Sequence, residues 1–341
     1  MMSKIETRKI GKSNTVVTKL GLGGAPFGDL FNLLSDEQVE NTLQAGWDAG
    51  VRYYDTAPYY GYGKSEHRVG HFLRNKSRQD FVISTKIGRV LKAASAPENF
   101  VSEFWAGGLP FEVEVDYSYD GIMRSYEDSL QRLGLPSVDL LLIHDLDFWF
   151  HKTEAKVSAY LVQLSTSGWR ALDSLRSSGA IKGIGAGINE MGMIPRFLDV
   201  VDVDFFLVAL PYTLLDQKVL DEEFPQCVER NVAAVIGAVF ASGILATGSV
   251  EGALYAYSPA TEKILEKVRR IESVCTRHNT PLAAAALQFP LAHSIVASII
   301  PGALEPEHVN SNVKLIEYPI PADLWSELKN EGLIREDAPT P

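Results

Sequence analysis

Four side chains that could take part in proton transfer follow short apolar runs of the chain. Asp55 and Tyr60 come directly after one such run, Lys86 ends the next, and His144 ends a third. An acid beside a lysine keeps the lysine charged, and a charged lysine is expected to lower the pKa of a phenol from roughly 10 by stabilising the phenolate. Such a phenol exchanges a proton with a carbonyl or hydroxyl oxygen, which the histidine would orient. The set therefore suits proton transfer coupled to hydride transfer with a nicotinamide.

Each of these residues taken alone also has an ordinary structural explanation. A strand-end aspartate can cap a helix, a lysine can be solvated, and a histidine can be a satisfied core residue. Their joint occurrence at successive strand ends favours a catalytic site. His67 and His71 have a spacing that could bind zinc on a helix, but no third ligand is evident nearby. We therefore interpret them as surface residues and expect no metal.

The elements that would position these residues alternate along the chain. Residues 35–47, 64–74, 120–133 and 165–178 show helical patterns, and Ser35 and Gln38 form a capping-box pair. The expected strands are residues 19–24, 51–55, 81–87, 138–144, 181–188, 204–210, 232–238 and 294–300. This alternation predicts an α/β fold, an eight-stranded parallel (β/α) TIM barrel with the active site at the carboxyl ends of the strands.

A doubly wound open sheet is the alternative fold. It would require a dinucleotide fingerprint early in the chain, but the glycines of residues 21–24 lack a third glycine in register. The glycines of residues 183–187 lie inside an expected strand, where they indicate close backbone approach. No linker rich in Pro or Ser interrupts the sequence, so we expect one domain over residues 1–341.

Composition bears on location and partners. No stretch reaches the roughly 18 apolar residues of a membrane span, and the charged segment Met1 to Ile10 lacks an apolar signal core, so we expect a cytoplasmic protein. Cys227 and Cys275 are far apart, which argues against disulfides and a thiolate metal site. The net charge of −11 argues against nucleic acids and anionic membranes as partners. The expected partner is a small-molecule substrate, and no oligomeric state is indicated.

The motifs around the four residues resemble those of the aldo-keto reductase superfamily. That family carries D-T-A-x-x-Y-G-x-x-x-S-E after its second strand, which matches residues 55–66 and selects Tyr60 as the catalytic tyrosine. The family's lysine matches Lys86 in ISTKIG, and its histidine matches His144 in LLLIHD. The resemblance covers nearly the whole chain and implies that these two residues, with Asp55 and Tyr60, form the catalytic set.

The resemblance also implies a nicotinamide cofactor, although the residues around the ring depart from the common pattern. The usual Ser-Asn pair reads Ile188-Asn189, the usual Gln is Ala209, and the stacking aromatic is replaced by Gly237 or Ala238. Asn189 is the expected carboxamide partner, and Phe240 is a candidate replacement for the aromatic. The complete set of expected cofactor residues is Asn189, Phe240, Gly243, Leu245, Pro301, Gly302, His308 and Asn312.

The family comparison favours NAD over NADP. Relatives that prefer NADPH present a lysine and an arginine to the 2′-phosphate, and the matching positions here are Gly302 and His308. The phosphate would lose two charge-assisted contacts, each worth roughly 1.5–3 kcal/mol. We therefore expect an NAD-dependent dehydrogenase that tolerates NADP at best.

Longer segments resemble one branch of the family, which contains aldose 1-dehydrogenases (L-fucose and D-threo-aldose types) and pyridoxal 4-dehydrogenase. These enzymes oxidise a cyclic hemiacetal to a lactone. The expected substrate residues are Phe27, Trp105, Asp145 and Trp149, in which the aromatic rings would stack on the substrate and the carboxylate would bind hydroxyls. A free aldose is slightly favoured over pyridoxal. A general NADPH aldehyde reductase and a non-catalytic, cofactor-sensing binding subunit remain alternatives.

Overall fold

The computed structural model describes residues 5–102 and 104–341. The first four positions of the charged segment Met1 to Ile10, on which the expectation about a signal core partly rested, lie outside these ranges. Within them, no helix combines the length and the apolar character that crossing a membrane requires.

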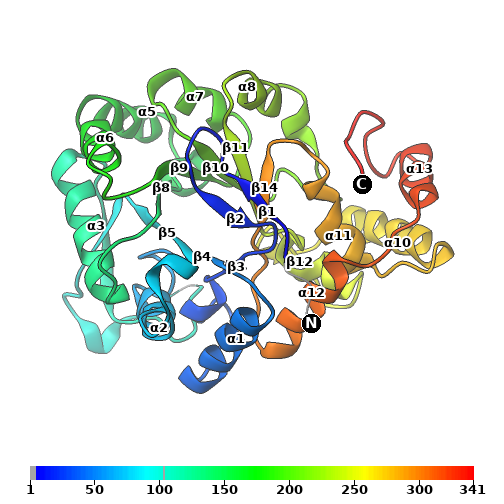
Figure 1. The fold of residues 1–341 in the computed structure, drawn as a ribbon, viewed down its shortest axis with the longest axis horizontal. Coiled ribbons are helices and arrows are strands. Elements are labelled where there is room, and N and C mark those ends of the chain that lie inside the picture. Colours follow the sequence, from blue (N-terminus) through cyan, green and yellow to red (C-terminus); the bar gives the residue numbers. More distant parts are fainter. Residues whose placement is uncertain (1–4, 103) are drawn as a thin grey trace.

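Eight parallel strands form the centre of the molecule, in the spatial order β14-β11-β10-β9-β8-β5-β4-β3. The backbone N–H of Gly21 donates to the carbonyl of Ile299 at 2.8 Å and joins the two edges, so the sheet closes into the predicted barrel (Figure 1). The strands are β3 (Leu22–Gly23), β4 (Tyr53–Asp55), β5 (Val82–Ile87), β8 (Leu140–His144), β9 (Gly183–Ile188), β10 (Phe205–Ala209), β11 (Ala233–Gly237) and β14 (Val296–Ile299).

Helices surround the barrel (Figure 1). They are α1 (Asp36–Asp48), α2 (Lys64–Leu73), α3 (Tyr119–Leu133), α4 (Phe148–His151), α5 (Glu154–Gln163), α6 (Trp169–Ser177), α7 (Met193–Val200), α8 (Glu223–Glu229), α9 (Ile244–Thr247), α10 (Glu262–Arg277), α11 (Leu282–Leu291), α12 (Pro306–Ile316) and α13 (Ala322–Asn330). The helix predicted over residues 165–178 differs at its start, because residues 164–168 form a π-helical turn between α5 and α6.

Local sequence signals set the ends of the helices that flank the site. Ser35 accepts a hydrogen bond from the backbone N–H of Gln38 at 3.1 Å, which caps α1 as predicted. Ser118 caps α3 in the same way, through the backbone N–H of Gly121 at 3.2 Å. Gly134 ends α3 in the left-handed conformation with φ of 62°, as its glycine predicted.

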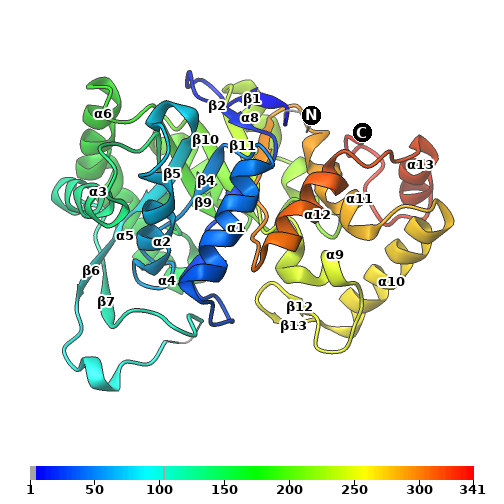
Figure 2. The ribbon, with the colours of Figure 1, turned by 60° about the horizontal axis from the view of Figure 1, so that its bottom comes forward.

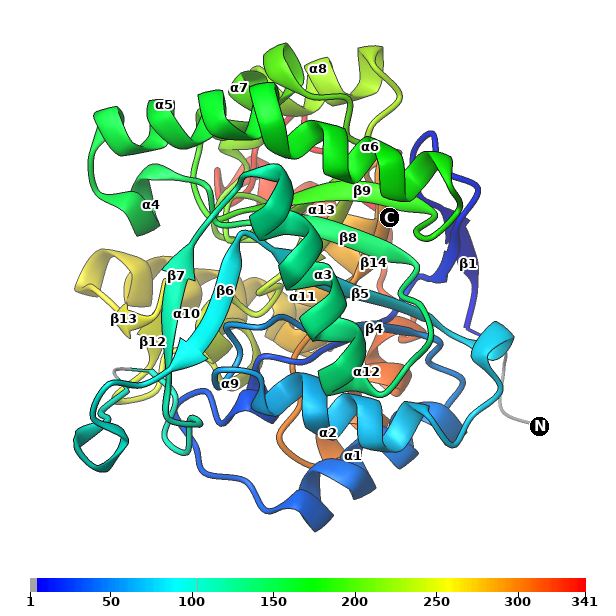
Figure 3. The same ribbon diagram turned by 90° about the vertical axis from the view of Figure 1, so that its left-hand side faces the viewer.

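The apolar core has two parts, one inside the barrel and one between the strands and the helices. Along β8, Leu140 and Leu142 belong to the inner cluster, whereas Leu141 and Ile143 belong to the outer one. This division explains why β8 is apolar at every position of the strand that precedes His144. The hairpin of β1 (Thr7–Lys9) and β2 (Val16–Thr18) lies at the amino end of the barrel (Figure 3).

Two further hairpins lie at the opposite end of the barrel (Figures 2 and 3). One pairs β6 (Arg89–Ala93) with β7 (Phe111–Val115), and the other pairs β12 (Leu254–Tyr255) with β13 (Ser258–Pro259). The sequence analysis predicted no strand in either of these segments. The missed signal is the alternation of apolar and acidic residues along β7, which alternates between partly buried and exposed positions.

Candidate active site

The loop that carries Tyr60 follows β4 and is held by a close approach of two glycines. A Cβ atom on Gly28 would lie 2.4 Å from the carbonyl carbon of Tyr60, and one on Gly61 would lie 2.5 Å from the carbonyl oxygen of Gly28. Gly61 also has a φ of +65°, which a residue with a side chain adopts at a cost. The two glycines therefore let the Tyr60 loop pack directly on the turn after β3.

The remaining polar residues of the motif tie α2 to the barrel. Ser65 donates from Oγ to the carbonyl oxygen of Gly24 at 2.7 Å, and its Oγ lies 2.8 Å from Oγ1 of Thr56. The buried carboxylate of Glu66 accepts from Thr85 Oγ1 at 2.6 Å and from Arg132 Nε at 2.6 Å. These contacts give the motif a structural role beside its chemical one.

Asp55, Tyr60 and Lys86 meet at the carboxyl ends of β4 and β5. The Nζ atom of Lys86 donates to Asp55 Oδ2 at 2.7 Å, to the carbonyl oxygen of Thr56 at 2.9 Å and to the hydroxyl of Tyr60 at 3.0 Å. Ser84 donates to the other oxygen of Asp55 at 2.7 Å. The lysine and the aspartate are buried, so their charges act on Tyr60 with little screening by solvent.

The expected effect of Lys86 on Tyr60 is not what the structure shows. Burial raises the pKa of Tyr60 well above 10, and the carboxylates of Asp55 and Asp145 add to this shift, while Arg89 opposes it. The physical reason is that Asp55 already matches the positive charge of Lys86, so burial of the phenol dominates. Tyr60 is therefore a neutral phenol near neutral pH.

His144 completes the set at the end of β8. Its ring centroid lies 5.7 Å from that of Tyr60, and its Nε2 atom lies 3.3 Å from Asp145 Oδ2. Burial lowers the pKa of His144 well below 6.5, and the charges of Arg89 and Lys86 lower it further. The imidazole is therefore neutral, which suits a group that forms a hydrogen bond to an uncharged oxygen of a ligand.

Arg89 is a charged residue of this site that the sequence analysis did not identify. Its Nη2 atom donates to Asp145 Oδ2 at 2.7 Å. Its guanidinium carbon lies 4.0 Å from the ring centroid of Tyr59 and 3.8 Å from that of Phe150. Arg89 is separated from the end of β5 by one glycine, and an arginine at such a position gives no sequence signal that its side chain turns inward.

Asp145 and Asn189, which were expected to contact ligands, contact each other. The Nδ2 atom of Asn189 donates to Asp145 Oδ1 at 2.8 Å and to Asp147 Oδ2 at 3.0 Å. Asn189 therefore presents its amide oxygen, for which no protein partner occurs among the described residues, as the group left to bind a carboxamide. Burial, together with the nearby charge of Asp145, raises the pKa of Asp147 to about 6.

Aromatic rings enclose the space beside Tyr60. Trp105, from the loop between β6 and β7, is buried, and its ring centroid lies 5.6 Å from that of Tyr60 and 5.5 Å from that of Tyr59. Trp149 lies on the rim and is 37% exposed. Phe27, which was expected to contact the substrate, instead belongs to the outer core cluster and is 1% exposed.

Tyr257 is a second residue that sequence reasoning missed. It lies in the turn between β12 and β13, and its ring contacts Phe31 and Trp149 at centroid distances of 6.5 and 6.1 Å. Its pKa is raised, first by burial and then by the charges of Tyr60 and Asp145. This hairpin therefore brings an aromatic ring to the catalytic end from a segment far away in the sequence.

The expected cofactor residues all follow the ends of β9, β11 and β14, at the same end of the barrel. Asn312 on α12 is 6% exposed, and its side chain makes no hydrogen bond to the described residues, so its amide is available to a ligand. Gly243 has an open face, because a Cβ atom there would meet nothing within 4 Å. These two observations fit a bound dinucleotide. Leu245, in contrast, is fully buried in the core, and Phe240 packs against its edge.

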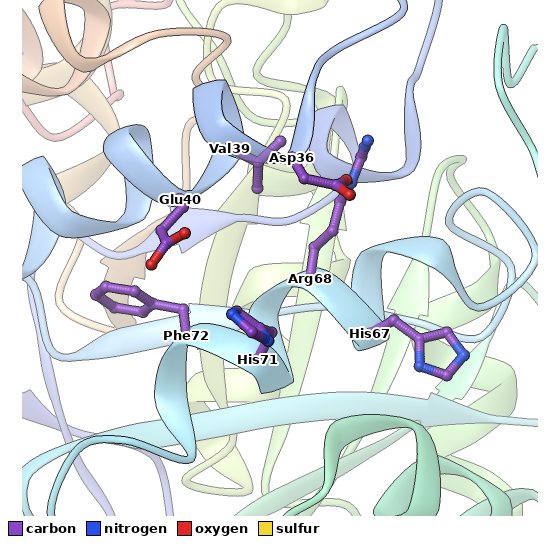
Figure 4. Close-up of a pocket in the computed structure, with 7 residues that line it drawn as sticks. All are labelled: Asp36, Val39, Glu40, His67, Arg68, His71 and Phe72. Atoms are coloured by element: carbon purple, nitrogen blue, oxygen red, sulfur yellow. The ribbon is translucent and has the colours of Figure 1, made fainter.

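The hollow around His67 and His71 lies in the outer helical layer, between α1 and α2 (Figure 4). The two imidazole rings do not face each other, and His71 Nδ1 lies 2.7 Å from Arg74 Nη2. In residues 5–102 and 104–341, no group of at least three His, Cys, Asp or Glu side chains could hold a metal ion.

Comparisons with known proteins agree with this geometry. The family model described as "Aldo/keto reductase family" matches residues 19–331. The chain is 42% identical to pyridoxal 4-dehydrogenase of Microbacterium luteolum over 96% of this chain and 98% of that protein. It is 38% identical to D-threo-aldose 1-dehydrogenase of a Pseudomonas species over 95% of this chain and 96% of that protein.

Solved structures show the same fold. The holo form of an aldo-keto reductase from Bacillus halodurans superposes with a TM-score of 0.74 at 23% identity, and 97% of each chain is covered. A glycerol dehydrogenase from Gluconobacter oxydans superposes with a TM-score of 0.73 at 21% identity, over 98% of this chain and 97% of that one. This chain is an oxidoreductase that belongs to the aldo/keto reductase family, and the four residues predicted to be catalytic lie at the strand ends of its closed barrel.

Proposed function

We propose that the protein is an NAD-dependent dehydrogenase that oxidises a cyclic hemiacetal to its lactone. The observation that carries the proposal is the contact of Tyr60 with Lys86, at 3.0 Å, beside the neutral imidazole of His144. Both relatives described above are named as dehydrogenases, and each aligns with nearly the whole chain.

The geometry supports a proposed role for each residue of the predicted catalytic set. The hydroxyl oxygen of the hemiacetal lies between Tyr60 and His144, which hold it by hydrogen bonds. The phenolate form of Tyr60 accepts the hydroxyl proton, and the hydrogen bond that Lys86 donates to its oxygen at 3.0 Å stabilises that phenolate. A nicotinamide, when bound, supplies the acceptor for the hydride of the same carbon. Asp55 keeps Lys86 charged and directed at Tyr60 by the 2.7 Å contact.

The contacts near α12 support a preference for NAD. A Cβ atom on Gly302 would lie 2.7 Å from the ring of Pro26, which leaves no room for the lysine of NADPH-preferring relatives. His308 is 48% exposed, and its Nε2 atom lies 3.3 Å from Glu305. Glu305 and Glu307 line a hollow with Glu37. Carboxylates at this place repel a 2′-phosphate, so NADP binds less well.

The substrate has two candidates, and a different observation supports each. A free aldose, which the sequence analysis favoured, has its support in the aldose dehydrogenase relative. Pyridoxal has its support in the pyridoxal dehydrogenase relative and in the aromatic rings of Tyr59 and Trp105. The engagement of Asp145 by Arg89 and Asn189 reduces the polar groups left for sugar hydroxyls, which favours pyridoxal.

The test is a matrix of two cofactors and two substrates. The purified protein is mixed with NAD⁺ or NADP⁺ and with L-fucose or pyridoxal, and the absorbance of the reduced cofactor is followed. We expect turnover with NAD⁺ on at least one substrate, and a kcat lowered by at least about 100-fold in the Tyr60→Phe variant. The substrate that is oxidised decides between the two candidates.

Two results would contradict the proposal. Reduction of aldehydes with NADPH, without oxidation of either hemiacetal, would make the protein a general aldehyde reductase. Tight cofactor binding without turnover of any substrate would make it a non-catalytic, cofactor-sensing subunit. A preference for NADP⁺ over NAD⁺ would overturn only the interpretation of Gly302 and His308.

A further inference from the structure

Arg89 is placed inside the site by the turn that precedes it. Gly88 has a φ of +98°, and a Cβ atom there would lie 2.1 Å from the ring of Tyr117, so only glycine fits between β5 and β6. The side chain of Arg89, the first residue of β6, is 1% exposed. A buried guanidinium is unfavourable unless its charge and its N–H groups are matched.

The charge of Arg89 is matched, but two of its nitrogen atoms are not. Asp145 accepts from Nη2, and the rings of Tyr59 and Phe150 lie against the guanidinium. Nε and Nη1 are buried and have no hydrogen-bond partner in the described part of the chain. Because folded proteins satisfy nearly all buried donors, these two indicate a partner that is not part of the protein.

The unmatched nitrogens belong to a side chain beside the catalytic oxygen site. A single carboxylate oxygen, Asp145 Oδ2, contacts both Arg89 Nη2, at 2.7 Å, and His144 Nε2, at 3.3 Å. Tyr59 packs on both residues, with its ring centroid 6.3 Å from that of His144. A ligand whose reacting oxygen contacts His144 therefore has its neighbouring substituents close to Arg89.

We propose that Arg89 is a specificity-determining residue, which donates from one of its unmatched N–H groups, on Nε or Nη1, to an oxygen substituent close to the reacting carbon of the substrate. The proposal rests on the hemiacetal dehydrogenase function proposed above. A guanidinium N–H donor suits an acceptor oxygen, and best an anionic one. In an aldopyranose this oxygen is the 2-hydroxyl, and in pyridoxal it is the 3-phenolate.

A purely structural role would also explain why Arg89 is buried. Through Asp145 it holds Asn189, and through its guanidinium it packs against Tyr59 and Phe150. Loss of these contacts would lower activity on every substrate by the same factor. Recognition of one substrate oxygen would lower activity only on substrates that carry that oxygen, so the two roles can be separated.

The experiment compares each substrate with its analogue that lacks the oxygen. The pairs are L-fucose with 2-deoxy-L-fucose, and pyridoxal with 3-deoxypyridoxal. Wild type, Arg89→Met and the control Arg196→Met are assayed for kcat/KM with NAD⁺. Arg196 pairs with Glu154 on the surface, at 2.7 Å, and its loss is expected to leave activity unchanged.

We expect Arg89→Met to lower kcat/KM by about 10- to 100-fold for the parent substrate, and by less than about 3-fold for its deoxy analogue. The pair that shows this difference identifies the oxygen that is recognised. Equal losses on both members of the pair would overturn the proposal and leave Arg89 a positioning residue. If wild type oxidises neither L-fucose nor pyridoxal, the proposed function fails, and the role of Arg89 fails with it.

Arg89→Lys covers the case in which the methionine variant does not fold. Lysine keeps the buried charge beside Asp145 but lacks the paired, planar donors of arginine. The ratio of kcat/KM for parent substrate over deoxy analogue is then expected to fall at least about 3-fold from its wild-type value. An unchanged ratio in a folded Arg89→Lys variant would contradict the proposal as well.

Discussion

Influences that oppose one another set the protonation state of Tyr60. Burial and the carboxylates of Asp55 and Asp145 favour the neutral phenol, whereas Arg89 favours the phenolate. Lys86 donates a hydrogen bond to the phenol oxygen, but Asp55 shares its charge. The neutral phenol is an acid that can give its proton to a carbonyl oxygen. The phenolate, which oxidation requires, forms only as the pH rises.

The direction of this pKa shift predicts opposite pH profiles for the two directions of the reaction. Because the pKa of Tyr60 lies well above 10, the phenolate fraction increases through the whole range from about pH 6 to pH 10. Initial rates of hemiacetal oxidation should rise with pH over this range, while rates of the reverse reduction should stay nearly flat. An oxidation rate that is independent of pH would contradict this role.

Removal of the Tyr60 hydroxyl tests the proton-transfer role of this residue directly. Tyr60→Phe keeps the ring that packs against Trp105 but has no proton to exchange. We expect kcat to fall by about 10²- to 10⁴-fold, with a melting temperature close to that of wild type. A variant that retains most of its kcat would move the proton transfer to another group, such as Tyr257.

Helix packing near the site depends on one glycine that cannot be replaced. A Cβ atom on Gly70, in α2, would lie 2.1 Å from the backbone carbonyl oxygen of Leu133, at the end of α3. Gly46, in α1, is a helical glycine whose Cβ atom would make only ordinary contacts, with Leu22 the nearest residue at 3.6 Å. The two positions form a matched pair.

Alanine at these two glycines should therefore change stability in opposite directions. Gly70→Ala forces α2 away from α3 and should lower the free energy of unfolding by about 2 kcal/mol. Gly46→Ala should raise it by about 0.5–1 kcal/mol, because alanine costs less conformational entropy in a helix. Denaturant titrations of both variants measure these changes, and a Gly70→Ala variant as stable as wild type would show that α2 packs differently.

The start of α4 provides a pH-dependent test of the buried carboxylates. Asp147 caps α4 through the backbone N–H of Phe150, at 2.9 Å, and its pKa is raised to about 6. A raised pKa means that the folded state favours the protonated form. The contribution of this group to the stability of the protein is therefore lost as the pH rises through 6. The free energy of unfolding of Asp147→Asn should therefore rise relative to that of wild type between pH 5 and pH 7, by on the order of 1 kcal/mol. A difference that does not change with pH would contradict the shift.

At the scale of the whole molecule, closure of the barrel joins the first part of the chain to the last part. The carbonyl of Lys19 accepts from the backbone N–H of Ile299, at 2.9 Å, so residues near the start and the end of the chain share one sheet. The outer core cluster includes residues of nearly every helix. We therefore propose that residues 1–341 form a single domain that unfolds in one cooperative step.

Two probes of unfolding test this proposal. Far-UV circular dichroism reports the helices, and tryptophan fluorescence reports positions that range from Trp47 to Trp325. The two denaturation curves should coincide in midpoint and slope. Separate midpoints would instead divide the chain into units that unfold independently.

The sequence alone predicts the barrel and the meeting of Asp55, Tyr60, Lys86 and His144, for a physical reason. Each of these residues ends a buried strand or directly follows one, and parallel strands that close into a barrel bring their carboxyl ends to one place. Local signals such as the Ser35 cap also correctly predicted where helices begin. Such features depend on short-range chemistry and on strand order.

The tertiary structure decides which groups of the site are free and which are occupied. Asp145 and Asn189 follow different strands, and only folding pairs them through the Nδ2 atom of Asn189. Arg89 enters the site because Gly88 adopts a positive φ directly before it and because Tyr59, in the loop after β4, and Phe150, in α4, pack against its guanidinium. The pKa of Tyr60 likewise depends on burial by the surrounding loops. Sequence spacing does not report such long-range contacts, because they depend on where distant loops pack in space.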